Sequence, residues 1–521
     1  MKLKVINVDS LVAVKADVLL VGCFEGEVAN SLSGNDASLT QLAVATGNGP
    51  ANQAEAEGFK GAVGETVVHF AGTQLGANKV VLFGLGARGK ATIASFRKAI
   101  TAALKKAKGL GAEHVAFAAL DPAAVAGSDA FAVGQALASY AGMVDYVINH
   151  QKTALAGHKP EKRFKKLHLV AALDSFTELA RGLKAGFQVA SAVNLARDLS
   201  NEPAGTLTPT KLAAVAKSVV AGNDCLSIKV FDHKQLKKMG AHALLAVAQG
   251  SDEKPRLIDI VYSPAGSKES DPVALTLIGK SVTFDSGGLD IKAADGMRHM
   301  KRDMSGGAVT LAAIQAIAAL GLNIKVRCVM AATENMINGS SYKPGDVLQT
   351  MKGLTVEVDN TDAEGRLTLA DAIEYAKRQG DTTIIDLATL TGAVKMMTGD
   401  VGACVFGNND DFTNLVFGSA TAQNERVLPV PMWEEFKDAN RSDMADLKNS
   451  GGAPGSTTAA YFLRAFAGEE IKWCHMDIAG VAFRDRELGA DPRGATGYGV
   501  RTLVELATRL AAQNQARSLD A

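Results

Sequence analysis

Short apolar runs alternate with longer segments of helical period along the first third of the chain. Runs of four to eight residues rich in β-branched side chains are typical of strands, and spacings of three and four between apolar residues are typical of helices. This alternation predicts a mostly parallel sheet covered by helices. The expected strands are Leu3–Val8, Val18–Gly22, Thr66–Ala71, Lys79–Phe83, His114–Ala119 and Lys166–Ala171, and the expected helices are Thr92–Lys108 and Ala130–Ile148.

One long helical stretch separates this part from the rest of the chain. Phe176–Ser200 is expected to form a single helix that ends before Pro203, so we place a domain boundary near residue 175. The interpretation is an α/β protein of two domains, a smaller one over 1–175 and a larger one over 176–521, the latter with a mixed sheet sandwiched by helices. Its expected strands are Leu226–Phe231, Ile258–Tyr262, Val273–Ile278, Lys325–Ala332, Thr383–Leu387, Gly402–Gly407 and Cys474–Ile478, and its expected helices are Ala308–Leu320, Thr368–Arg378, Thr457–Ala467 and Leu503–Gln513.

Composition agrees with this division and excludes several classes of protein. A chain of 521 residues is too long for one ordinary core. Its 55 basic residues balance 55 acidic ones, so no overall charge favours nucleic acid. Five cysteines without paired spacing fit a reducing cytosol and argue against a disulfide framework. The uncharged stretch Met304–Ile324 has the length of a membrane span, but its many small residues favour a buried helix. We expect a soluble cytoplasmic protein without a membrane segment.

A glycine-rich turn between two predicted elements imitates a nucleotide-binding motif. Gly84, Gly86 and Gly89 follow a predicted strand with dinucleotide-fingerprint spacing, and Lys90 nearly completes a phosphate loop. Position 91 is alanine, so the hydroxyl that would hold magnesium is missing. We therefore interpret these glycines as a tight strand-to-helix turn that needs positive φ and close packing.

Two clusters of charged residues are the strongest chemical signal. In the stretch VDNTDAEGRL, Asp362 and Glu364 lie two apart, and in extended backbone they would share a face and repel each other. Upstream, Lys280 and Asp285 follow a predicted strand, before two glycines. Asp303 comes just before the small-residue helix. Since ligand sites in open α/β sheets lie at the carboxyl ends of strands, both clusters can converge at one edge.

Four carboxylates gathered in this way would balance two divalent cations, and carboxylate sites suit Mg²⁺, Mn²⁺ and, in two-metal sites, Zn²⁺. Each acid taken singly is more often a helix cap or a solvated turn residue. Spacing does not choose Asp285 and Asp303 over Asp290 and Asp295, and it does not exclude Asp359. No His-Glu-x-x-His or Gly-x-Ser-x-Gly motif offers another chemistry. The two histidines nearest these motifs, His299 and His475, are expected to pack or donate hydrogen bonds.

Longer blocks around both clusters resemble one family. NTDAEGRL at 360–367 resembles the signature of the M17 leucyl (cytosol) aminopeptidases, bacterial type. Further blocks follow in that family's order, namely GKSVTFDSGGLDIK at 279–292, KRDMSGG at 301–307, ENMINGSSYKPGDV at 334–347, DLATLTGA at 386–393, GSTTAAYFL at 455–463 and HMDIAGVAF at 475–483. The resemblance covers nearly all of 190–505. The first domain resembles the family's variable N-terminal domain in layout only, with assembly or regulation as its expected role.

The resemblance implies a peptidase that uses two metal ions, Mn²⁺ or Zn²⁺ with Mg²⁺ or Co²⁺ as alternatives. Asp285 and Glu364 would bridge the ions. Asp362 would complete one site, partly through its backbone carbonyl, and Lys280 with Asp303 would complete the other. A lysine binds metal only as a neutral amine, and a neighbouring dication depresses the pKa of that amine.

The remaining residues carried over by the resemblance would act on the substrate. Lys292 would stay charged and stabilise the oxyanion, and Arg366 would hold a bicarbonate ion as general base. The free amine of a peptide would bind one metal and its first carbonyl oxygen the other. The site and the first side-chain pocket would be lined by Met300, Asn360, Thr389, Leu390 and Gly392.

The expected activity is therefore release of leucine and other mostly apolar residues from the N-terminus of peptides by a metal-activated water. The family also implies a homohexamer, a dimer of trimers. Three alternatives stay open at this point: a dinuclear phosphoesterase, a nucleotide-binding regulator that uses Gly84–Lys90, and a nucleic-acid-binding first domain, which the neutral charge disfavours.

Overall fold

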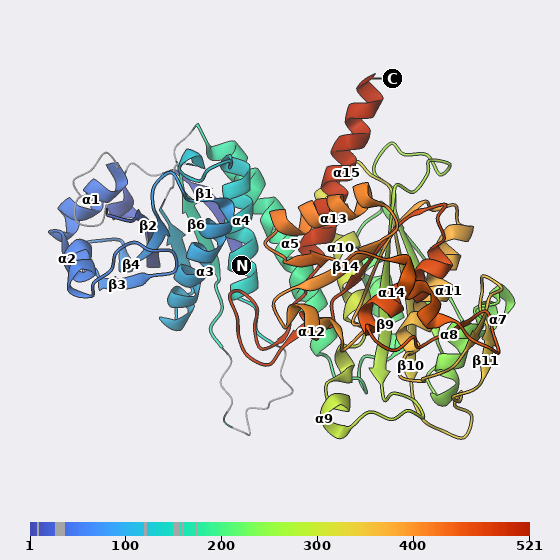
Figure 1. The fold of residues 1–521 in the computed structure, drawn as a ribbon. Helices are drawn as coiled ribbons and strands as arrows, with labels where there is room; N and C mark the ends of the chain where they lie inside the picture. Colours follow the sequence, from blue (N-terminus) through green and yellow to red (C-terminus); the bar gives the residue numbers. More distant parts are fainter. Residues whose placement is uncertain are drawn as a thin grey trace. The chain divides into compact units, whose positions relative to one another are not determined.

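The chain forms two compact units in a computed structural model that describes residues 1–7, 10–26, 37–118, 122–148, 157, 161–171 and 174–520. One unit comprises Met1–Asn194 with Glu487–Pro492, and the other comprises Leu195–Arg486 with Arg493–Ala521 (Figure 1). The division falls inside the long helix α5 (Phe176–Asn201), with which the sequence analysis begins the second domain. Two expected strand ends, Val8 and Ala119, lie outside the described residues.

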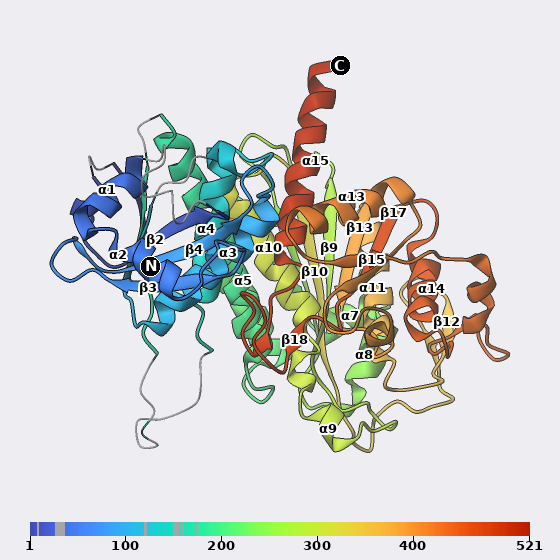
Figure 2. The same cartoon turned by 60° about the vertical axis from the view of Figure 1, so that its left-hand side comes forward.

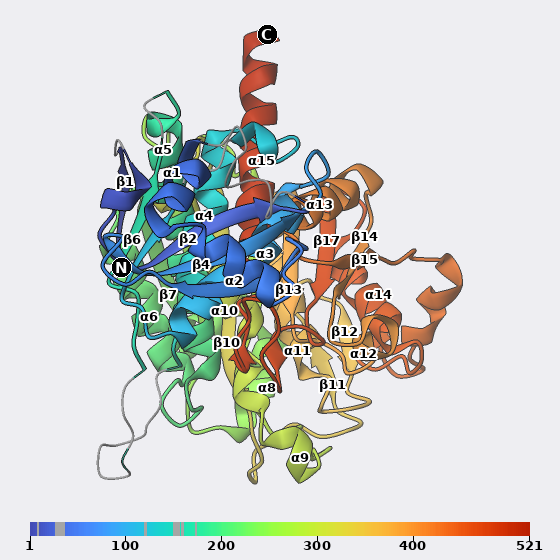
Figure 3. The same ribbon diagram turned by 90° about the vertical axis from the view of Figure 1, so that its left-hand side faces the viewer.

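The N-terminal unit is built on one six-stranded sheet (Figure 3). All neighbouring strands are parallel except the edge pair β3–β4. Helix α3 (Ile93–Gly109) packs with α4 (Ala130–Val144), and Phe96 of α3 meets Phe117 of the sheet edge-on at 6.3 Å between ring centroids. On the other face lie α1 (Ala37–Thr46) and α2 (Gly49–Ala56). In order across the sheet the strands are β1 (Lys2–Ile6), β6 (Lys166–Val170), β5 (His114–Phe117), β2 (Ala16–Phe24), β4 (Ala77–Gly86) and β3 (Thr66–Phe70).

The glycines whose spacing resembles a nucleotide-binding motif have structural roles in this unit. Gly84 and Gly86 lie inside β4 rather than after it. A Cβ at Gly84 would come within 2.0 Å of the Ala62 carbonyl oxygen, and Gly86 has φ +81. Helix α3 begins further on, where Thr92 and Ser95 form a capping box. Close backbone approach and positive φ therefore account for both glycines.

The larger unit contains an eight-stranded mixed sheet (Figure 2). Its central strands are parallel, whereas both flanks contain antiparallel pairs. This confirms the α/β class and the mixed strand direction expected from the sequence. In order the strands are β15 (Val427–Pro429), β14 (Ala403–Gly407), β17 (Lys472–Asp477), β13 (Thr383–Ala388), β9 (Leu275–Asp285), β10 (Val326–Asn335), β8 (Arg256–Tyr262) and β7 (Leu226–Phe231).

Helices cover both faces of this sheet, and glycines on a strand and on a helix allow close contact at one of these faces. Helix α10 (Ser305–Leu320) lies directly on β9, since a Cβ at Gly279 would be 2.5 Å from Gly307 Cα. On the opposite face, Ile278 belongs to the core that also contains α11 (Glu364–Arg378) and α14 (Gly455–Ala467). The stretch Met300–Leu320 is long and apolar enough to cross a membrane, yet 83% of its most apolar window is buried inside the protein, as in a core helix.

Several elements differ from the expected pattern. Strand β9 continues seven residues past the expected end at Ile278, to Asp285. The segment before the second acidic cluster, β12 (Thr355–Glu357), belongs to a separate small sheet with β11 (Val347–Gln349) and β16 (Leu447–Lys448). The expected helix Leu503–Gln513 is shorter at both ends than α15 (Val500–Asp520). Further elements that were not expected from the sequence are α1, α2, β15, α6 (Pro209–Ala221), α7 (His233–Met239), α8 (His242–Val247), α9 (Ala294–Met297), α12 (Val394–Thr398), α13 (Asp410–Ala422) and the pair β18 (Phe483–Arg484) and β19 (Gly494–Ala495).

Candidate metal centre

Strand β9 contributes two charged residues near the middle of the large sheet. Lys280 lies within the strand, and its side chain is only 3% exposed. Asp285 is the last residue of β9 and is paired in register with Asn335 at the end of β10. β9 has parallel neighbours on both sides, but β13 pairs with it only as far as Gly279, whereas β10 accompanies it to Asp285, so the carboxyl end of β9 extends beyond β13. This buried strand end is where the two charged clusters meet.

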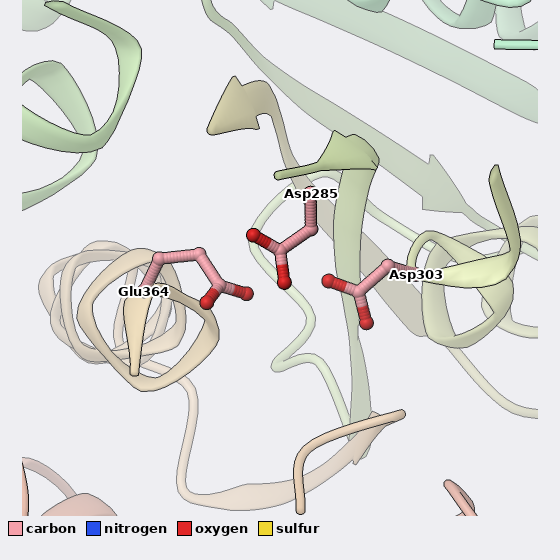
Figure 4. A group of neighbouring side chains, drawn as sticks. All are labelled: Asp285, Asp303 and Glu364. Atoms are coloured by element: carbon pink, nitrogen blue, oxygen red, sulfur yellow. The ribbon is translucent and has the colours of Figure 1, made fainter. Parts of the chain in front are cut away.

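Two further carboxylates reach this point from helix ends (Figure 4). Asp303 follows the one-turn helix η5 (Met300–Arg302), just before α10, and Glu364 is the first residue of α11. Carboxylate oxygens of Asp285, Asp303 and Glu364 all lie within 4.8 Å of one another, and all three residues are buried. The three side chains come from three separate elements and point toward one centre.

Two lysines lie between the carboxylates. Lys280 Nζ is 2.8 Å from Asp303 Oδ2 and 2.7 Å from Glu364 Oε1, and it also donates to the Thr389 carbonyl at 3.1 Å. Lys292 Nζ is 2.8 Å from Asp285 Oδ2. Lys292 also contacts Asp362 Oδ1.

The clustering shifts the proton affinity of every group in it. Burial raises the pKa of Asp303 well above its ordinary value. Burial and the charge of Glu364 raise the pKa of Asp285 to about 6 and also raise that of Asp362. Burial opposes ionisation of Glu364 as well, but Lys280 and Lys292 outweigh it and lower the pKa of Glu364. The pKa of each lysine is raised, because the carboxylates outweigh the effect of burial.

The donor set fits divalent cations. Oε2 of Glu364 is buried without a hydrogen-bond partner among the described residues, which is costly for a carboxylate unless a cation faces it. Four carboxylates, those of Asp285, Asp303, Asp362 and Glu364, gather around only two ammonium groups. All-oxygen donors of this kind suit hard and borderline ions.

The second acidic cluster is not extended, so the expected i, i+2 arrangement is wrong. Asp362 lies in a turn between β12 and α11, and Glu364 is already helical. The Asp362 backbone N–H donates to Asn360 Oδ1 at 2.7 Å, which tightens this turn. The directions of the two carboxylates are therefore set by the turn and the first residue of the helix, and not by the alternation of side chains along a strand.

The structure also separates the acids that spacing left undecided. Asp290 Oδ2 accepts from the Thr361 backbone N–H at 2.7 Å, and the Asp290 backbone N–H donates to Thr361 Oγ1 at 2.8 Å. Asp290 therefore ties the two loops together and does not join the cluster. Asp295 is exposed at the start of α9. Asp359 is exposed, and its backbone N–H donates to Asn449 Oδ1 at 2.8 Å.

Arg366 is buried two residues after Glu364, in the first turn of α11. Its Nη1 donates to the Asn449 carbonyl at 2.7 Å, and its Nε has no hydrogen-bond partner among the described residues. Burial lowers the pKa of this guanidinium to about 10, although Glu364 and Asp477 oppose the shift. A guanidinium with an unused donor can bind a small planar anion.

The expected substrate-binding residues lie on the one-turn helix η5 and on two loops. Thr389 is joined to the cluster directly, since its Oγ1 donates to Asp303 Oδ1 at 2.8 Å. No hydrogen bond or ion pair in the described chain links the other four to the charged side chains of the cluster. Met300, Asn360 and Leu390 are partly buried, and Gly392 is exposed.

Two asparagines support the site and were missed by sequence reasoning. Asn335 Nδ2 donates to Asp285 Oδ1 at 2.9 Å and to the Thr361 carbonyl at 3.0 Å. The position of Asn335 at the end of a strand next to β9 could have indicated it. Asn449 Nδ2 donates to the Asn360 carbonyl at 2.7 Å. No local signal marks Asn449, which lies 89 residues from its partner.

The two histidines make structural contacts. His475 on β17 is fully buried, with Nδ1 2.5 Å from Asp386 Oδ1. His299 packs on Phe483, with ring centroids 5.8 Å apart.

A buried carboxylate–lysine centre at a strand end of a two-unit α/β protein defines the class as an α/β protein with a candidate metal centre. Comparison with known proteins specifies the family. The model of the cytosol aminopeptidase family, catalytic domain, matches residues 194–504, and that of the family's N-terminal domain matches residues 20–154. The chain belongs to this family, the M17 peptidases, as its sequence blocks predicted. It is therefore an aminopeptidase, a hydrolase that acts on peptides.

Relatives and solved structures agree over almost the whole chain. A probable cytosol aminopeptidase of Alkaliphilus oremlandii is 37% identical over 510 residues, covering 97% of this chain and 99% of that protein. One from Roseiflexus castenholzii is 40% identical over 456 residues, 86% of this chain and 90% of that protein. A mutant of tomato leucine aminopeptidase superposes with a TM-score of 0.86 at 32% identity, covering 98% of this chain and 96% of that one. The bottromycin maturation enzyme BotP in complex with Mn gives 0.81 at 30% identity, with coverage of 95% and 100%.

Proposed function

We propose that this chain is a leucyl aminopeptidase that depends on two divalent metal ions and releases leucine and other mostly apolar residues from the N-terminus of peptides. The observation that carries the proposal is the buried trio of Asp285, Asp303 and Glu364, whose oxygens lie within 4.8 Å of one another. In the proposed arrangement Asp285 and Glu364 would help to hold both ions. Lys280 and Asp303 would hold one of them, and Asp362 would hold the other.

The ions are proposed to be Mn²⁺ or Zn²⁺, with Mg²⁺ or Co²⁺ as alternatives, and the related enzyme BotP has been solved in complex with Mn. When bound, they would supply Lewis acidity and bring the pKa of a shared water toward neutrality. Lys280 can serve as a ligand only after losing its proton. In the ion-free protein its pKa is raised by Asp303 and Glu364, despite burial, so binding of metal would release that proton.

Two basic side chains would act on the reacting peptide bond. Lys292 stays charged, because the carboxylates around it raise its pKa despite its burial. Its ammonium would donate to the carbonyl oxygen as negative charge develops there. Arg366 would hold a bicarbonate ion, whose chemistry is that of a general base, and its unused Nε supports this role.

The free α-amine of the peptide would bind one of the ions, which explains the requirement for a free N-terminus. The pocket for the first side chain would be formed by Met300, Asn360, Thr389, Leu390 and Gly392. An apolar pocket separates side chains that differ by one methylene by only about 1–3 kcal/mol, so broad specificity is expected. We further propose a homohexamer, a dimer of trimers, in the cytoplasm, on the basis of family membership.

Hydrolysis of leucine p-nitroanilide, measured before and after chelation and after return of Mn²⁺ or Zn²⁺, tests the proposal. Activity should disappear on chelation and return with metal, and the N-acetylated substrate should be inert. Asp303→Asn should lose activity, whereas Asp295→Asn, which removes an exposed carboxylate outside the cluster, should keep it. Full activity in the chelated enzyme would refute metal dependence, and equal cleavage of the acetylated substrate would refute amine anchoring. Turnover of p-nitrophenyl phosphate alone would indicate a phosphoesterase instead.

A further inference from the structure

A cavity in the N-terminal unit is lined mainly by basic side chains. Its volume is about 660 Å³, which lies in the range of small-molecule sites. It lies between β1, β6 and the segment that follows the short helix η1 (Leu11–Ala13). Strands β1 and β6 are neighbours at one edge of the sheet (Figure 3). Among the lining residues that the structure describes, five are basic and none is acidic: Lys2, Lys4, Lys15, Lys166 and His168 are joined by the apolar Leu3, Ile6, Ala13 and Val14.

Strand pairing brings these cations face to face. In the parallel register of β1 and β6, Lys2 is opposite Lys166, and Lys4 is opposite His168. Like charges directly opposite each other on neighbouring strands destabilise a sheet. Burial lowers the pKa of His168, and Lys166 and Lys4 lower it further. This part of the sheet therefore accumulates positive charge at some cost to its own stability.

The acid closest in sequence does not neutralise the cluster. Asp17 follows Lys15 by two residues, but its Oδ2 accepts from the backbone N–H groups of Glu113 and His114, both at 2.9 Å. Lys2, Lys4 and Lys15 are exposed, so their ammonium groups are accessible to a ligand. A bound anion would relieve the repulsion between Lys2 and Lys166, the cross-strand pair in which both side chains are charged.

We propose that this cavity binds a phosphomonoester of nucleotide size. Lysines act as compact point charges that suit phosphate, whereas recognition of carboxylate more often uses the arginine fork. The lining contains no arginine. Its apolar wall, which includes Ile6 and Val14, can cover a ring or another apolar body attached to the phosphate. The site is separate from the proposed peptidase centre and does not depend on that proposal.

Isothermal titration calorimetry of the full-length protein with adenosine monophosphate as the probe tests the inference. The pocket variant is Lys4→Gln with Lys166→Gln, and Lys15→Gln is a second variant outside the strands. The control is Lys98→Gln with Lys106→Gln, which removes the same charge from exposed positions on α3, outside the lining. Hydrolysis of leucine p-nitroanilide by each variant serves as the check on folding.

Saturable binding with one site per chain is expected in the wild type and the control, weakened by about tenfold or more in the double pocket variant, because a hydrogen bond to a charged group is lost. Adenosine without phosphate should not bind, and inorganic phosphate should compete. The ring resonances of His168 should shift on binding. Absence of saturable binding, or equal affinity in the pocket and control variants, would overturn the proposal. Binding of duplex DNA without binding of the monophosphate would overturn it too, by showing an extended polyanion surface.

Discussion

Replacing Gly365 by alanine offers the sharpest test of the site geometry, because it displaces a charged group without removing any. A Cβ at this position would lie 2.5 Å from Cε and 2.6 Å from Nζ of Lys280. Ordinary contacts need about 3.5–4.0 Å, so the ammonium must move by roughly 1 Å. Its two ion pairs, 2.8 Å to Asp303 and 2.7 Å to Glu364, would both be broken or distorted.

A displacement of this size in a catalytic constellation costs about 100-fold in rate, which corresponds to about 2.7 kcal/mol of transition-state stabilisation. Overpacking of the buried site should lower the free energy of unfolding by about 1–3 kcal/mol. The assays are kcat/KM for leucine p-nitroanilide with added metal and urea denaturation followed by circular dichroism. Gly339→Ala is the matched control, because nothing lies within 4 Å of its added Cβ. Wild-type kcat/KM in the Gly365→Ala enzyme would refute the assigned role of Lys280.

Three further changes probe other parts of the molecule. Lys292→Ala and Asp362→Asn should each lose most turnover with unchanged circular dichroism, and wild-type rates would remove that residue from its role. Gly84→Ala should lower the free energy of unfolding of the N-terminal unit by about 1–3 kcal/mol in urea denaturation, through the clash with the Ala62 carbonyl. Burial opposes ionisation of Asp17, but two backbone N–H groups that donate to its carboxylate lower its pKa below 3.8. The loss of unfolding free energy in Asp17→Asn should therefore be complete above pH 3.8 and should vanish as the pH falls further. A loss that does not depend on pH would contradict this.

The sequence predicts the strands best where each is bounded by a change of pattern. β7 was predicted with its observed bounds, Leu226–Phe231, because a polar turn precedes it and a capped helix follows it. The expected strand ends before the observed end of β9, because the last residues of β9 include charged and small side chains. These side chains are buried in the candidate site and not in a hydrophobic core. A hydrophobic pattern cannot distinguish such a segment from a loop.

The start of α11 was missed for a related reason. The expected helix began at Thr368, whereas the observed one begins at Glu364, without a side-chain cap. Its first three residues include a buried glutamate and a buried arginine, which resemble an exposed turn when only polarity is considered. Asn449 lies outside any local pattern, since its role depends on the packing of two loops that are 89 residues apart in sequence.

The lysines of the centre carry a consequence for how the enzyme acquires its ions. Since Lys280 and Lys292 already occupy positions between the carboxylates, the ion-free protein has internal counterions that offset part of the repulsion among these carboxylates. Under the proposed function, loading is then an exchange of protons for dications, so apparent metal affinity increases with pH. The enzyme without metal would stay folded and would regain activity when ions are supplied.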